Sequence, residues 1–119
     1  MLILSNLALA IVASLHIGFL VLEMFLWTKP VGKKIFGLPE EFMKSSAALA
    51  ANQGLYNGFL AAGLLWGLYL GPGGFAVKMF FLGCVIVAGL FGAATAKRSI
   101  LWTQALPGAI AIILVYFTR

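Results

Sequence analysis

The sequence predicts an all-α protein, a four-transmembrane-helix bundle with both termini on the outer side of the membrane. Of its 119 residues, 63% are hydrophobic and only 9% are charged, whereas about a quarter of the residues in a soluble domain are charged. Four apolar runs each approach or exceed the ~20 residues that a spanning helix needs. The net charge of +5 comes mainly from basic residues at the ends of these runs, which is typical of membrane proteins and argues against nucleic-acid binding.

The expected spans belong to one integral membrane domain, 1–119, and occupy about residues 2–27, 45–70, 75–96 and 100–118. The first has no basic leading segment and is too long for the apolar core of a signal peptide. A tight turn, Gly71-Pro72-Gly73-Gly74, separates the second span from the third. In the fourth span, Pro107 predicts a kink.

Residues 28–44 form the only long connection between the expected spans. Pro39 followed by two glutamates favours the start of a short helix, because proline and acidic residues suit a first helical turn. The apolar side chains of this segment leave two readings open: a loop that lies on the membrane surface, and a solvated loop with interfacial anchors. These side chains are Ile35, Phe36, Leu38, Phe42 and Met43.

Basic residues are unevenly distributed between the expected loops. With both termini outside, six basic residues face the cytoplasm and two face outward, which is the bias that the positive-inside rule describes. We therefore expect a multi-pass protein of the cytoplasmic (inner) membrane, with membrane lipids around it. The six are Lys29, Lys33, Lys34, Lys44, Lys97 and Arg98, and the two are Lys78 and Arg119.

The second span carries a run of hydrogen-bonding side chains that hydrocarbon cannot satisfy. Asn52, Gln53, Tyr56 and Asn57 lie within six residues and share a sector of roughly 140° at ~100° per residue. Each must face protein, water or a ligand. Interhelical hydrogen bonding is the structural interpretation, and ligand binding is the functional one.

Two ionisable residues, His16 and Glu23, lie seven positions apart on the first span, so both point to one side. They are ~10 Å apart by helical rise, too far to bond directly. Glu23 either pairs with Lys29, Lys97 or Arg98 or accepts a hydrogen bond from Gln104, or it is a proton carrier or substrate anchor. His16 has three open roles: a hydrogen-bonded core residue, a general acid or base, and an axial haem ligand. A single histidine makes a poor zinc site.

Depth along the helices places the polar side chains in the cytoplasmic half of the bundle. Glu23 and Gln104 are expected about one turn inside the cytoplasmic surface, and Asn52 and Gln53 about two turns inside it. His16, Tyr56 and Asn57 are expected near the midplane. We therefore expect one cavity open to the cytoplasmic side. Its candidate catalytic residues are His16, Glu23 and Tyr56, and its candidate substrate-binding residues are Asn52, Gln53, Asn57, Gln104 and Trp27; no metal site is expected.

Such a cavity suits a protein that binds or transforms a small lipophilic molecule, by isomerisation or proton transfer, and whether it is an enzyme stays open. Three alternatives remain: a small proton-coupled multidrug-type exporter, a haem-binding membrane protein that uses His16, and a purely structural membrane subunit. The sequence has no phosphate-binding loop, dinucleotide fingerprint, zinc-protease motif or serine elbow.

Glycines on the second span predict a homo-oligomer, a dimer or a trimer. They recur at intervals of four or five residues and allow another helix to approach closely. We expect that one small bundle cannot use two differently directed glycine faces internally. These residues are Gly54, Gly58, Gly63, Gly67 and Gly71.

Three stretches carry a resemblance to a known family: Leu15-His16 followed by residues 21–27, the long motif of residues 50–63, and Gln104-Ala105-Leu106-Pro107. In these stretches the chain resembles the bacterial family catalogued as domain of unknown function 1304. The resemblance covers nearly the whole chain and implies a small four-span integral membrane protein. It implies no reaction, and it assigns no catalytic residue.

Overall fold

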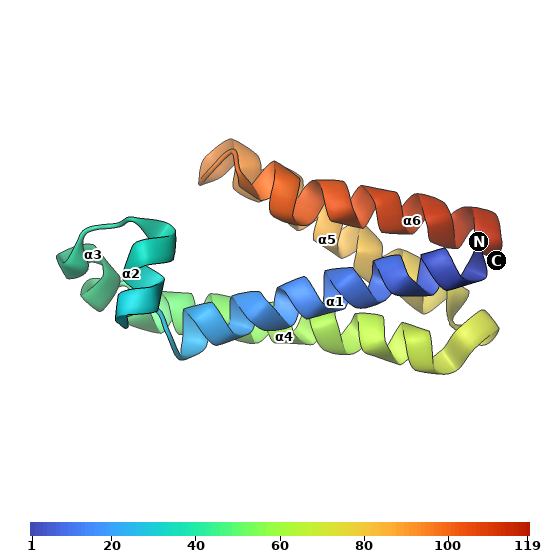
Figure 1. Cartoon of the computed structure of the whole chain (residues 1–119), viewed down its shortest axis with the longest axis horizontal. Coiled ribbons are helices and arrows are strands. Elements are labelled where there is room, and N and C mark those ends of the chain that lie inside the picture. Colours follow the sequence, from blue (N-terminus) through green and yellow to red (C-terminus); the bar gives the residue numbers. More distant parts are fainter. The chain divides into compact units, whose positions relative to one another are not determined.

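The computed structural model describes all residues, Met1–Arg119, and its secondary structure is entirely helical, as predicted. The long helices are α1 (Leu2–Met24), α4 (Ala47–Leu70), α5 (Phe75–Thr95) and α6 (Leu106–Thr118), and the short helices α2 (Pro30–Phe36) and α3 (Glu40–Ser45) lie between α1 and α4 in the chain (Figure 1). Three apolar stretches are long enough to cross a membrane: Leu2–Met24, Ala47–Thr95 and Leu101–Thr118.

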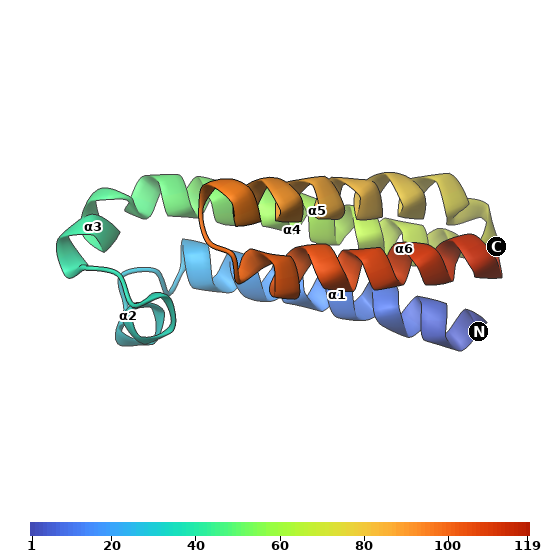
Figure 2. The same cartoon turned by 90° about the horizontal axis from the view of Figure 1, so that it is seen from above.

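The chain packs as two compact units, one of residues 1–15 with 60–119 and the other of residues 16–59. In the first unit, α1, α4, α5 and α6 all contribute to one apolar core, and both termini lie at the same end of this unit (Figures 1 and 2). This core consists of Leu9, Val12, Ala13, Leu64, Leu82, Val85, Ala111 and Val115.

The 49-residue apolar stretch folds as a helical hairpin. A 3₁₀ turn, η1 (Gly71–Gly74), joins α4 to α5, and Gly71 has a φ of 60°, a conformation that glycine adopts without strain. Gly67 faces Lys78, and Gly63 faces Phe81 further from the turn, so the two helices run antiparallel (Figure 2). Lys78 is buried, and its Nζ donates a hydrogen bond to the Gly71 carbonyl at 3.0 Å.

The chain enters α6 through a π-helical turn, η2 (Leu101–Ala105), in which the Leu106 N–H donates to the Leu101 carbonyl. The irregularity expected near Pro107 takes this form. Proline has no N–H, and its ring crowds the carbonyl four residues earlier, so a wider turn just before it relieves both problems. Gln104 lies in this π turn.

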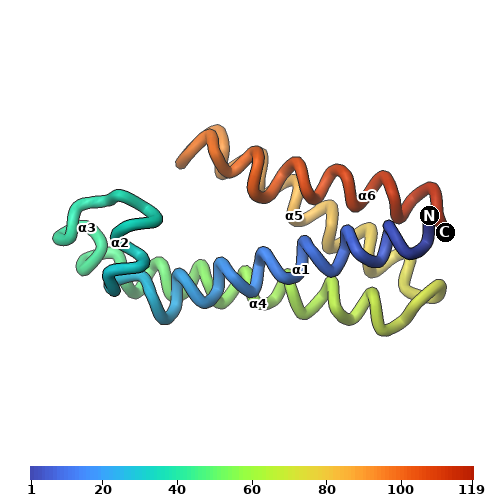
Figure 3. The backbone as a smooth tube through the Cα atoms, viewed as in Figure 1, coloured from blue at the N-terminus to red at the C-terminus, as the bar shows by residue number.

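In the second unit, α2 and α3 connect the end of α1 to the start of α4 (Figure 3). The Trp27 indole Nε1 donates to Ser46 Oγ at 3.2 Å, and its ring packs on Phe36 with centroids 4.8 Å apart. The short helix predicted after Pro39 is confirmed as α3, with Pro39 at its N-cap. The sequence did not predict α2.

The glycines of α4 are used within the chain. In the second unit, α1 side chains cover Gly54 and Gly58, and in the first unit α5 side chains cover Gly63 and Gly67. The expectation that a small bundle cannot use both glycine faces internally is therefore wrong, because two different helices approach α4 at different levels. The predicted homo-oligomer loses this argument and stays a prediction.

Two glycines of α5 provide a matched test of the close packing in the first unit. A Cβ on Gly89 would lie 2.6 Å from the backbone nitrogen of Ala105, whereas nothing lies within 4 Å of a Cβ on Gly83. We expect Gly89→Ala to lower the free energy of unfolding by about 1–3 kcal/mol through overpacking against backbone. Gly83→Ala should leave it unchanged or raise it by up to about 1 kcal/mol. Unfolding by sodium dodecyl sulfate from mild detergent micelles measures both, and equal effects would contradict this packing.

Candidate functional site

A hydrogen bond between a carboxyl and an amide joins α1 to α4 in the second unit. Asn57 Nδ2 donates to Glu23 Oε1 at 2.6 Å. Glu23 lies in the last turn of α1, and Asn57 lies in the first half of α4. The pair is therefore an interhelical contact within the apolar stretches of the chain.

The glycines beside Asn57 bring the two helices close enough for this bond. A Cβ on Gly54 would lie 2.8 Å from Met24 Cγ and 3.1 Å from Glu23 Cβ, and one on Gly58 would lie 2.6 Å from a methyl group of Leu20. Larger residues at these positions would push α1 away from α4. The glycine spacing that the sequence showed thus positions the polar pair.

Glu23 has no basic partner within its own unit. The ion pairs of this unit join Lys33 and Lys44 to Glu40, and none includes Glu23. Of the basic partners left open above, Lys29 therefore does not pair with Glu23, and pairing with Lys97 or Arg98 stays a prediction. The carboxyl is half-buried and meets a neutral amide, which supplies a hydrogen bond but no opposite charge. A carboxylate in apolar surroundings is costly under these conditions.

His16 is fully buried on α1, with 0% of its surface exposed. Its ring packs edge-on against Phe19, with centroids 5.2 Å apart. Ser5, Leu9 and Val12 are also buried, and their spacing of four and three residues leads along one packed face of α1 to His16. On one continuous helix, the seven residues from His16 to Glu23 correspond to a rise of ~10 Å.

The polar run of α4 divides between its two sides. Asn57 is 6% exposed and lies on the buried stripe with Ala50, Gly54, Ala61 and Leu64. These positions are spaced by four and three residues, as expected for one packed helix face. The remaining members lie off the stripe and are exposed: Asn52, Gln53 and Tyr56. The structure therefore joins Asn57 with Glu23 but leaves the rest of the run on the surface of α4.

Trp27 and Gln104 have other surroundings. Trp27 holds the α2–α3 connection through Ser46 and Phe36. Gln104 is half-buried in the π turn and belongs to the other compact unit.

The depths predicted for Glu23 and Asn57 are wrong, because these residues meet although the sequence placed them more than a turn apart. Met24, the last residue of α1, faces Gly54. Since α4 begins at Ala47, it continues for about two turns beyond that level. Depths counted from the predicted ends of the spans missed this extension.

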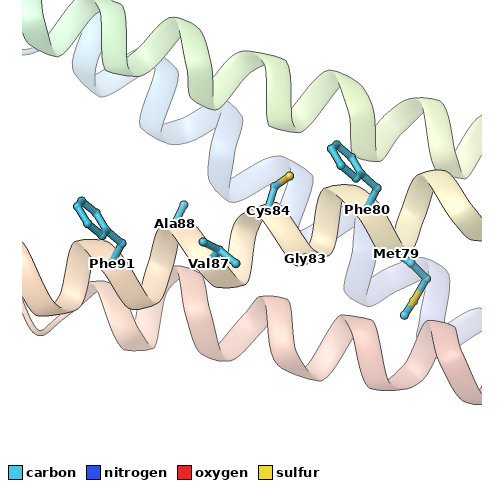
Figure 4. Close-up of a pocket in the computed structure, with 7 residues that line it drawn as sticks. All are labelled: Met79, Phe80, Gly83, Cys84, Val87, Ala88 and Phe91. Carbon is cyan, nitrogen blue, oxygen red and sulfur yellow. The ribbon is translucent and has the colours of Figure 1, made fainter.

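A hollow lies on one face of α5 and contains none of the candidate residues (Figure 4). It is almost wholly apolar and is lined by Met79, Phe80, Gly83, Cys84, Val87, Ala88 and Phe91. Phe80, Val87 and Phe91 are largely exposed, as suits a helix face in contact with lipid. No group of three or more His, Cys, Asp or Glu side chains is placed to hold a metal ion.

Comparisons with known proteins extend over most of the chain. The sequence model of a family described as "Protein of unknown function (DUF1304)" matches residues 10–116. The chain is similar to the uncharacterised protein YpaA of Lactococcus lactis subsp. lactis (strain IL1403), with 26% identity over 98 residues, which cover 81% of this chain and 82% of YpaA. No solved structure matches.

Proposed function

Because the chain belongs to the DUF1304 family, which is described only by its unknown function, we propose a function from the Glu23–Asn57 pair. We propose that the chain is an integral membrane protein that binds a small lipophilic molecule, and that an enzyme built on this site would transform the molecule by isomerisation or proton transfer. The carboxyl–amide pair between α1 and α4 is the polar part of the site, and the apolar helix faces receive the rest of the molecule.

The proposal includes four membrane crossings. As one straight helix, the stretch Ala47–Thr95 would be ~74 Å long, more than twice the ~30 Å of a bilayer core. Its hairpin instead supplies two crossings. Both termini then lie on one side, and the six-to-two distribution of basic residues favours the outside of a bacterial inner membrane.

An alkaline phosphatase fusion after Arg119 tests this topology. The enzyme is active only outside the cytoplasm, so the fusion should be active in a bacterium, and a fusion within residues 37–39 of the α2–α3 connection should be inactive. The reverse pattern, or equal activity of the two fusions, would contradict the proposed crossings.

One observation carries the binding proposal: Glu23 has a single hydrogen bond, from a neutral donor. Asn57 holds Oε1 and orients the carboxyl, while Oε2 is left to accept from a hydroxyl, amine or protonated group of a ligand. A carboxyl that only joined two helices would serve no better than a neutral amide and would cost more in lipid. A ligand group that donates a hydrogen bond to Oε2 would explain why position 23 holds a carboxyl and not a neutral amide.

The position of His16 determines how long a molecule must be to contact both His16 and Glu23. Carboxyl and imidazole groups accept and return protons, and the rise between Glu23 and His16 is ~10 Å. A lipophilic molecule that spans this distance meets one proton-exchanging group near each end. Isomerisation within it needs only proton movement. The exposed polar side chains of α4, Asn52, Gln53 and Tyr56, lie off the packed face that carries Asn57 and are not part of this proposal.

A comparison of two acid-to-amide substitutions tests the proposed ligand site. The wild type, purified in mild detergent, should retain a small molecule that mass spectrometry finds in its organic extract. Glu23→Gln should lose this molecule, because its side chain keeps the shape but not the charge. Glu41→Gln, which changes an exposed acid outside the long apolar stretches, should retain it. Equal retention by both variants would contradict the proposal.

The same preparation separates the alternatives. Proton-coupled export also requires a membrane carboxyl, and efflux from proteoliposomes that stops when the proton gradient collapses would favour an exporter. A Soret band would assign His16 to haem. An extract without any small molecule, together with no efflux and no visible absorption, would leave a structural subunit.

A further inference from the structure

The connection between α1 and α4 is a folded element with an apolar surface. Four large apolar side chains of residues 31–42 are 39–53% exposed: Val31, Ile35, Leu38 and Phe42. Val31 and Ile35 are four residues apart and therefore share one face of α2. Four such side chains on a 12-residue segment form an apolar patch that water would disfavour.

This element has a fixed arrangement. Met43 is fully buried, and Gly32 lies against the backbone carbonyls of Leu26 and Trp27, where no side chain would fit. Trp27 bonds to Ser46, whose hydroxyl donates to the Phe42 carbonyl at 2.6 Å. The exposed apolar side chains thus belong to a segment whose backbone is fixed by the packing of Met43 and Gly32 and by the hydrogen bonds of Ser46.

Basic side chains accompany the apolar patch. Glu40 lies 2.7 Å from Lys33 Nζ and 3.9 Å from Lys44 Nζ. Its hydrogen bond and ion pair with Lys33 hold the pKa of its carboxyl below the usual value, so at neutral pH it stays charged and keeps this partner. Lys29 and Lys34 are exposed, and the structure records no ion pair for either. Lys34 directly precedes Ile35 and therefore flanks the apolar face.

We propose that the α2–α3 element is a docking surface for acidic phospholipids, in which Lys29 and Lys34 bind headgroups while Val31, Ile35, Leu38 and Phe42 enter the boundary of the acyl chains. Chain connectivity supports this occupant, because the element joins two long apolar helices and cannot leave the membrane surface. Its combination of lysines with exposed apolar side chains is that of interfacial segments that bind anionic lipid. The inference rests on the proposed crossing of α1 and α4.

Fluorescence quenching in vesicles tests this surface with the whole protein. In a Cys84→Ala background, an environment-sensitive fluorophore is attached to Ile35→Cys or, as a control, to Glu41→Cys, which replaces an exposed acid. The vesicles contain equal parts of phosphatidylcholine and phosphatidylglycerol, with a quencher on one of the two lipids. The fluorophore at 35 should be quenched more strongly by labelled phosphatidylglycerol, and the fluorophore at 41 should be quenched weakly by both lipids.

Substitutions of lysine then separate local binding from general attraction. Lys29→Gln and Lys34→Gln should each reduce the preference at position 35 for phosphatidylglycerol about fivefold. Lys97→Gln, an exposed lysine before α6, should not change it, and added inorganic phosphate should not compete. Equal quenching by the two lipids, or a preference that survives the loss of both lysines, would overturn the acidic-lipid site.

A water-exposed emission at position 35 would overturn the docking surface as a whole. Failure of the underlying crossings gives a different result, because the protein would then be released from the vesicles by an alkaline wash.

Discussion

The hydrogen bond between Glu23 and Asn57 determines how α1 meets α4 in the second unit. An acid inside an apolar helix needs a polar partner, since hydrocarbon offers none. Here the partner is an amide on another helix, 2.6 Å away. Gly54 and Gly58 permit that approach because side chains of α1 occupy the space where their own would be. One polar contact and two absent side chains therefore fix how α1 meets α4 in this unit.

The position of this contact also explains the connection that follows α1. Because Met24 faces Gly54, α4 begins about two turns beyond the end of α1. After α1 the chain must therefore cover that distance before α4 begins. Residues 25–46 do so through α2 and α3, held by Trp27, Ser46 and buried Met43. The offset between the two helices that places Glu23 beside Asn57 thus also makes room for the folded α2–α3 element, with its exposed lysines and apolar side chains.

Hydropathy and turn residues predicted the helical class and, when the π turn η2 is counted with α6, the ends of the long helices to within three residues. The partner of Glu23 could not be predicted from the sequence, because it depends on where α1 ends relative to α4, and a shift of a few residues changes which side chains face each other. A clue was present in the spacing of Gly54, Asn57, Ala61 and Leu64, which marks one packed face and separates Asn57 from Tyr56. The π turn around Gln104 could not be predicted either, since Pro107 predicts an irregularity of the helix but not its form.

We expect Glu23 and Asn57 to stabilise each other directly, and a double-mutant cycle measures this coupling. Unfolding free energies of Glu23→Ala, Asn57→Ala and the double variant give the coupling, which should be about 1–2 kcal/mol, above the ~0.6 kcal/mol average of hydrogen bonds between membrane helices because a carboxyl takes part. A parallel cycle that combines Glu23→Ala with Asn52→Ala, which removes an exposed amide of α4, should give a coupling near zero. If the two cycles gave equal couplings, the pair would not be the contact that joins α1 to α4.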